Sequence, residues 1–121
     1  MEFNQYNTTV QQWIHTVLEN RETNADVVLE CCRDIIAYGR ETDDPKLIGF
    51  GCFYGGEIYY GLNDGEHFFH MMTEALTYLD RAEEWELVVR CYNYLGIASM
   101  SRGNPSIALD YYMNGLKDSD T

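Results

Sequence analysis

The stretch from 89 to 121, which decides the fold, reads VRCYNYLGIASMSRGNPSIALDYYMNGLKDSDT. Leu95 and Gly96 continue an apolar stripe at helical spacing. Asn104 and Pro105 then supply the N-cap and the first residue of a second helix. Two helices joined by a short turn form an antiparallel hairpin, so the stretch predicts a helical hairpin.

Small residues mark the place where the two helices of this hairpin meet. Gly96 on the first helix and Ala108 on the second leave room for the backbones to approach closely. The larger side chains of Tyr92, Leu95 and Tyr112 fill the space around that contact. The pattern therefore predicts that Gly96 packs directly against the second helix.

These positions resemble the tetratricopeptide repeat (TPR) family, whose repeat follows the pattern W-x₂-L-G-x₂-Y, then A-x₃-F, then P. The matching positions are Tyr92 in place of Trp, Leu95, Gly96, Ala108, and Tyr112 in place of Phe. Ser99 and Asp120 stand where the pattern has Tyr and Pro. The resemblance implies stacked helix pairs that bind a protein or peptide, and it implies no enzyme activity.

Apolar residues at helical spacing predict two earlier hairpins. Asp44 and Pro45 supply the cap and the first residue of the middle hairpin. Gly51 and Gly55 lie one helical turn apart and predict that a neighbouring helix packs closely there. The three predicted hairpins cover about 8–39, 45–79 and 84–118.

The predicted fold is all-α, with three antiparallel helix hairpins stacked as a right-handed TPR-like superhelix (α-solenoid) in a single domain over 1–121. Three hairpins reach the number of repeats that a stable stack needs. Gly56 and Gly96 occupy corresponding positions 40 residues apart (96 − 56). The family repeat has 34 residues, so the surplus predicts a longer loop around 80–84.

The composition is that of a soluble globular domain, with 45% hydrophobic and 23% charged residues. Twenty acidic and 8 basic residues give a formal net charge of −12. The basic residues are spread singly, whereas nucleic acid and anionic membranes bind clustered Lys and Arg, so neither is a predicted partner. No apolar run approaches the ~20 residues of a membrane span, and the chain is predicted to be cytoplasmic.

The resemblance implies a binding surface on the first helix of each hairpin, the helix that faces the inside of the superhelix. The implied residues are Phe53, Glu57, Tyr60, Arg90, Asn93, Ile97 and Met100. An alternative stays open, in which several of these aromatic side chains belong to the core, because aromatic residues at helical spacing usually pack inside. Family members that grip a C-terminal carboxylate use a cluster of Lys, Arg and Asn, and this chain offers only Arg90 and Asn93 there.

The last predicted helix is apolar around most of its circumference. Leu109, Met113 and Leu116 form a second apolar surface, beyond the side that packs within the hairpin. Repeat arrays usually end in a polar cap. This surface therefore predicts either a following helix in a longer protein, of which this chain is the N-terminal part, or a homodimer through the C-terminal helix.

Residue patterns for chemistry are weak in this chain. His67 and His70, at i and i+3, have the spacing of part of a metal site, but no third ligand follows at a recognisable spacing. A metal-binding protein using these two histidines is therefore the least favoured alternative. No catalytic arrangement and no cofactor site can be identified, and the four cysteines form no C-x-x-C pair.

Within the TPR family, residues 45–120 look most like the N-terminal TPR regions of clostridial-type signalling proteins, in which such arrays precede a GGDEF diguanylate cyclase domain. This resemblance is carried by FFHMMTEALTYL and YNYLGIASMSRGNPSIALDYYMNGL. The sequence Gly55-Gly56-Glu57 is not the cyclase motif, because it lies in a predicted helix. The implied function is a non-catalytic regulatory module for an attached output domain, and a free-standing TPR adaptor is the alternative.

Overall fold

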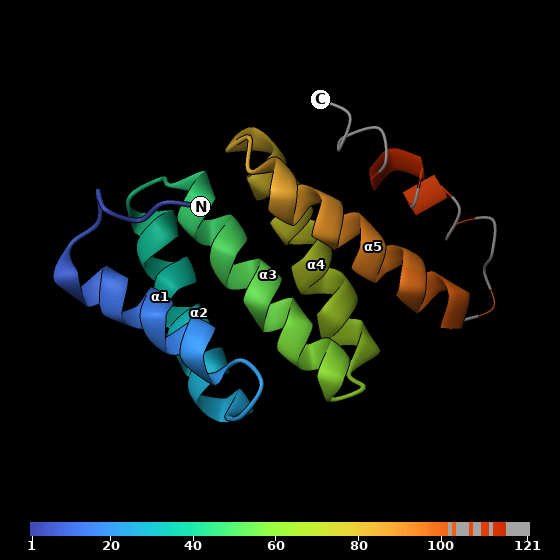
Figure 1. The fold of residues 1–121 in the computed structure, drawn as a ribbon, viewed down its shortest axis with the longest axis horizontal. Coiled ribbons are helices and arrows are strands. Elements are labelled where there is room, and N and C mark those ends of the chain that lie inside the picture. The colour runs from blue at the N-terminus through green and yellow to red at the C-terminus, as the bar shows by residue number, and fades with distance from the viewer. Residues whose placement is uncertain (102, 104–106, 108–109, 112, 116–121) are drawn as a thin grey trace.

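The computed structural model describes residues 1–101, 103, 107, 110–111 and 113–115, which contain α-helices and no β-strand (Figure 1). The predicted all-α class is therefore confirmed for these residues. Figure 1 shows α1, α3 and α5 in one layer and α2 and α4 in the other. The five helices are α1 (Thr8–Asn20), α2 (Ala25–Glu41), α3 (Pro45–Gly61), α4 (Gly65–Arg81) and α5 (Trp85–Ser101).

Helices α2 to α5 repeat with a period of 20 residues. Each is 17 residues long, and they begin at 25, 45, 65 and 85. The middle residue of each three-residue turn between them is left-handed, with φ of 53° at Asp43, 59° at Asn63 and 57° at Glu83. Gly103, which follows Glu83 at the same interval, has φ of 77°. One local geometry therefore reverses the chain after each helix.

The turn after α2 shows how this reversal is made. The Asp44 N–H donates to the Gly39 carbonyl at 2.8 Å, and the Asp43 N–H donates to the Arg40 carbonyl at 3.4 Å. These two bonds form a Schellman motif, which needs a left-handed residue. The Asp44 carboxylate then accepts the Leu47 N–H at 3.2 Å, which confirms Asp44 as the predicted cap of α3. The turns after α3 and α4 repeat both backbone bonds.

The predicted longer loop around 80–84 is wrong. Helix α4 continues to Arg81 and α5 begins at Trp85, so only three residues join them, as at the other two turns. The residues in excess of a 34-residue repeat lie within the helices instead.

Helix α3 is the central helix, packed between α2 and α4. A Cβ built at Gly51 would lie 2.6 Å from Ile36 Cγ1 on α2, and a Cβ built at Gly55 would lie 2.7 Å from Met71 Cε on α4. The predicted close packing at these two glycines is confirmed. The largest fully buried side chains are Phe50, Phe53, Phe68, Ile35, Leu47, Met72, Leu79 and Leu95.

The third hairpin is described only in part. After α5, residues 107, 110–111 and 113–115 are helical. Gly115 lies against α5, where a Cβ would come within 3.3 Å of Tyr92 Cβ. Ala108, Leu109 and Leu116 lie outside the described residues, and so does the predicted contact between Gly96 and Ala108.

Candidate functional site

Side chains from α1, α3 and α5 meet at Glu57. The Glu57 carboxylate accepts two hydrogen bonds from Arg21, both at 2.8 Å. It also accepts one from Arg90 Nη2 at 3.2 Å and one from the Tyr94 hydroxyl at 2.7 Å. Arg21 is the C-cap of α1, while Arg90 and Tyr94 lie on α5. We call these four residues the Glu57 cluster, which ties the first helices of all three hairpins together.

Aromatic rings enclose the two arginines of the Glu57 cluster. The Arg21 guanidinium lies 5.2 Å from the centre of the Tyr54 ring, and the Arg90 guanidinium lies 4.7 Å from that of Phe53. The Glu57 side chain is only 12% exposed, so its charge depends on these partners rather than on water. Burial, together with the adjacent Glu57 carboxylate, raises the pKa of Tyr94, which keeps its hydroxyl a donor.

The structure divides the predicted binding surface into a buried and an exposed part. It brings Glu57 and Arg90 together, and it buries Phe53 completely, which agrees with the alternative that this ring is core. The other predicted residues are exposed on α3 and α5, and we call them the exposed strip: Tyr60, Asn93, Ile97 and Met100. The Tyr60 ring lies 5.3 Å from the Tyr94 ring, so the strip adjoins the Glu57 cluster.

A pocket of about 520 Å³ opens beside the exposed strip. It lies where the turn between α3 and α4 meets the C-terminal half of α5. Its lining residues are Tyr60, Gly61, Asn63, Asp64, Gly65, Phe68, Phe69 and Ala98. The strip therefore borders a hollow in which a partner side chain can be enclosed.

Sequence analysis missed Arg21 and Tyr94 as members of the cluster, and it missed Lys46. A signal was present, because Lys46 and Glu57 are the only charged residues of α3. A charge on an otherwise apolar, buried helix requires a partner from elsewhere in the chain. The residue that pairs with it could not be found from sequence, since the contact depends on how the hairpins stack.

Lys46 is surrounded by the N-terminal segment, residues 1–6. Its ammonium group donates to the Glu2 carbonyl and lies 5.0 Å from the centre of the Phe3 ring and 5.9 Å from that of Tyr6. It also lies 3.9 Å from a carboxylate oxygen of Glu84. The Lys46 side chain is only 17% exposed, and it fixes the segment to α3.

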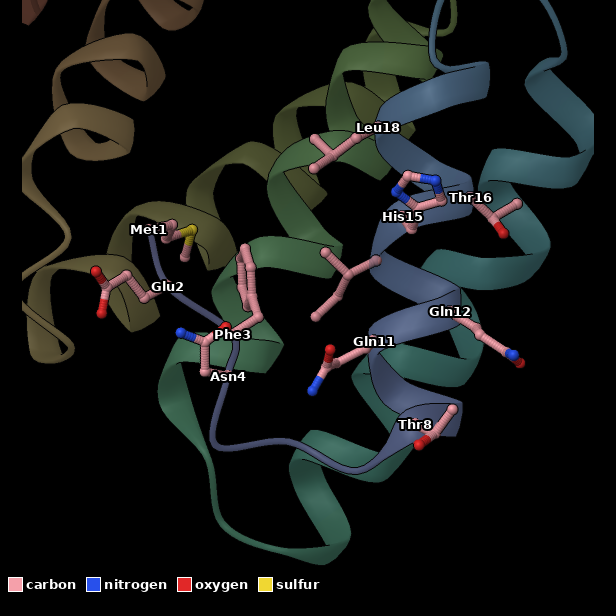
Figure 2. Close-up of a pocket in the computed structure, with 11 residues that line it drawn as sticks. Met1, Glu2, Phe3, Asn4, Thr8, Gln11, Gln12, His15, Thr16 and Leu18 are labelled. Carbon is pink, nitrogen blue, oxygen red and sulfur yellow. The ribbon is translucent and has the colours of Figure 1, made fainter.

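A groove of about 770 Å³ separates the N-terminal segment from α1 (Figure 2). Met1, Glu2, Phe3 and Asn4 form one wall, and α1 forms the other (list in Figure 2). Figure 2 shows Gln11 and Leu18 projecting from α1 on the side of the segment. A smaller cavity of about 160 Å³ continues from Met1, Phe3 and Leu18 to Leu87 and Arg90 of α5. The two cavities together run along the layer formed by α1, α3 and α5.

The two histidines engage different neighbours. His67 Nδ1 lies 2.7 Å from Asp64, and its ring stacks on Tyr59 with centres 4.8 Å apart. His70 Nε2 lies 3.7 Å from Glu74. Over the described part of the chain, no three His, Cys, Asp or Glu side chains are grouped to hold a metal ion.

The predicted self-association surface is seen only at Met113, whose side chain is 58% exposed, and at its neighbour Ile107, which is 48% exposed. Among the helices that the structure describes, none is long and apolar enough to cross a bilayer. Comparisons with protein-family models, with curated proteins and with solved structures found no match for this chain.

Proposed function

We propose that this chain is a non-catalytic TPR-like module that binds a protein or peptide on the layer formed by α1, α3 and α5. The observation that carries the proposal is the Glu57 cluster, which joins the first helices of three successive hairpins on one face. The regular 17-residue helices and repeated turns support a right-handed superhelix built from these hairpins.

The exposed strip supplies the contact surface. Ile97 and Met100 are 43% and 54% exposed, and Asn93 adds a hydrogen-bonding side chain on the same helix. A partner seated here would touch α3 through Tyr60 and α5 through the other three residues. Because the Glu57 cluster ties these helices to α1, binding at the strip would bias the relative positions of all three hairpins.

Affinity capture followed by mass spectrometry tests this assignment. We expect a partner to be retained by the wild-type chain and lost by the double variant Tyr60→Ala with Asn93→Ala. The matched control is Thr73→Ala with Thr77→Ala, two exposed residues of α4 in the opposite layer. Equal recovery of every captured protein by all three chains would refute a binding role for the strip.

We further propose that the module controls an attached output domain, such as a GGDEF diguanylate cyclase. The support is the apolar character of Ile107 and Met113, which a following helix would cover. Reading the gene beyond the codon for Thr121 tests this step. A stop codon there would favour a free-standing TPR adaptor.

A further inference from the structure

The N-terminal segment, residues 1–6, lies on the layer of α1, α3 and α5 as a bound peptide would. The Phe3 ring packs edge-on against Phe50 of α3, with ring centres 5.2 Å apart. Lys46 holds the Glu2 carbonyl, and Gln11 of α1 donates to the Tyr6 carbonyl at 2.7 Å. The segment thus uses one aromatic anchor and two backbone carbonyls, the means by which extended peptides are commonly recognised.

The segment is packed on one side only. Its anchors lie on α3, while the 770 Å³ groove stays open between it and α1. On the α1 wall, Leu18 is 42% exposed and Ile14 forms part of the lining. A chain with few anchors and an open apolar groove beside it can leave without disturbing the helices, because the helices keep their own core contacts.

The position of Lys46 points to ligand recognition. It lies in the first turn of α3, where the positive end of the helix dipole disfavours a cation. Two aromatic rings, a carbonyl oxygen and the Glu84 carboxylate offset that effect. Three of these four compensating groups belong to the segment or to whatever replaces it.

We propose that residues 1–6 are a displaceable internal occupant of this groove. Their place can be taken by an extended segment of a partner protein with two aromatic residues spaced as Phe3 and Tyr6. The partner's first aromatic ring packs on Phe50, and the carbonyl before it accepts a hydrogen bond from Lys46. This inference rests on the proposed peptide-binding function and names the kind of peptide and its internal competitor.

Fluorescence anisotropy with a labelled peptide MEFNQYN, blocked at both ends, tests the exchange on the full chain. We expect the Phe3→Ala chain to bind this peptide about tenfold more tightly than wild type, or better, because its own segment no longer fills the groove. Binding should disappear when the peptide carries Phe3→Ala or when the chain carries Lys46→Ala in addition. Asn4→Ala, an exposed change in the same segment, should bind as wild type does.

Equal peptide binding by the wild-type and Phe3→Ala chains, or no binding by Phe3→Ala while circular dichroism shows it folded, would overturn the proposal. A wild-type dimer in light scattering that Phe3→Ala converts to a monomer would assign the groove to a second copy and would also overturn it. Partner capture through the exposed strip is measured separately. A failure here with capture intact refutes the groove ligand alone, whereas absence of any captured partner refutes the proposed function.

Discussion

At the scale of single residues, α3 carries two charges, and each one organises its surroundings. Glu57 satisfies two arginines and a tyrosine, and Lys46 holds the N-terminal segment. A buried ion pair adds little net stability when it is complete, but removing one partner leaves the others charged without compensation. The Glu57 cluster is therefore expected to be sensitive to small changes.

We predict that Glu57→Gln lowers the free energy of unfolding by about 2 to 3 kcal/mol. The expected loss lies below that of a fully buried pair, because Arg21 and Arg90 are 28% and 34% exposed. Urea denaturation measures it. Glu66→Gln, an exposed change of the same chemistry on α4, should alter stability by less than about 0.5 kcal/mol. A Glu57→Gln loss no larger than that of the control would contradict the prediction.

The buried thiols predict loss of stability in alkali. Burial raises the pKa values of Cys52 and Cys91 to about 12, and the Glu74 carboxylate adds to the effect at Cys52. A raised native pKa gives stability that is complete below the unfolded value and is lost as pH rises through the native one. Between pH 8 and pH 10 we expect the free energy of unfolding to fall by about 2 to 3 kcal/mol.

Urea denaturation at the two pH values measures this fall. The control carries Cys52→Ala with Cys91→Ala, and its stability should depend less steeply on pH. A wild-type profile that is flat from pH 8 to pH 10 would show that the two thiols ionise as easily in the native chain as in the unfolded one.

At the scale of the element, each turn combines a Schellman motif with the cap of the next helix. The sequence indicated this at Asp44, where Pro45 follows, and the predicted start of α3 is confirmed. It did not indicate the turn between α4 and α5, because Glu83 has neither the glycine nor the asparagine that usually marks a left-handed position. Local propensity therefore located the helices but gave the wrong length for this turn.

We predict that Glu83→Gly stabilises the chain by about 1 kcal/mol, because glycine adopts the left-handed conformation without the steric cost of a Cβ. Asn63→Gly is the matched control at the equivalent turn. Its gain should be only a few tenths of a kcal/mol, since asparagine tolerates this conformation. Thermal denaturation of both variants decides the matter. A fall in the melting temperature of Glu83→Gly would mean that its side chain makes a contact worth more than the strain.

At the scale of the whole molecule, the helices of the first two hairpins could be predicted because their apolar stripes are local patterns. The partners of Glu57 and Lys46 could not, because they come from other hairpins. The predicted face was correct in placing Glu57 beside Arg90, yet sequence spacing alone did not separate the buried Phe53 from the exposed Ile97. Burial depends on what an entire layer stacks against.

Self-association belongs to this scale. We predict that the wild-type chain forms a dimer through the surface that includes Ile107 and Met113, both exposed. Met113→Glu should raise the dimer dissociation constant about tenfold or more, because it places a charge in an apolar interface of an already acidic chain. Light scattering across a concentration series measures this, with the exposed Thr77→Glu of α4 as control. A wild-type chain that stays monomeric at the highest concentration would remove the dimer.

The 20-residue period of α2 to α5 limits how such a chain can grow. Each unit of one helix and one turn reverses the direction of travel, so duplicating a single unit would make every later helix run backwards and would exchange the two layers. Duplicating two units restores both direction and layer. Lengthening by gene duplication is thus subject to parity, and viable longer forms are expected to differ from this one by an even number of helices.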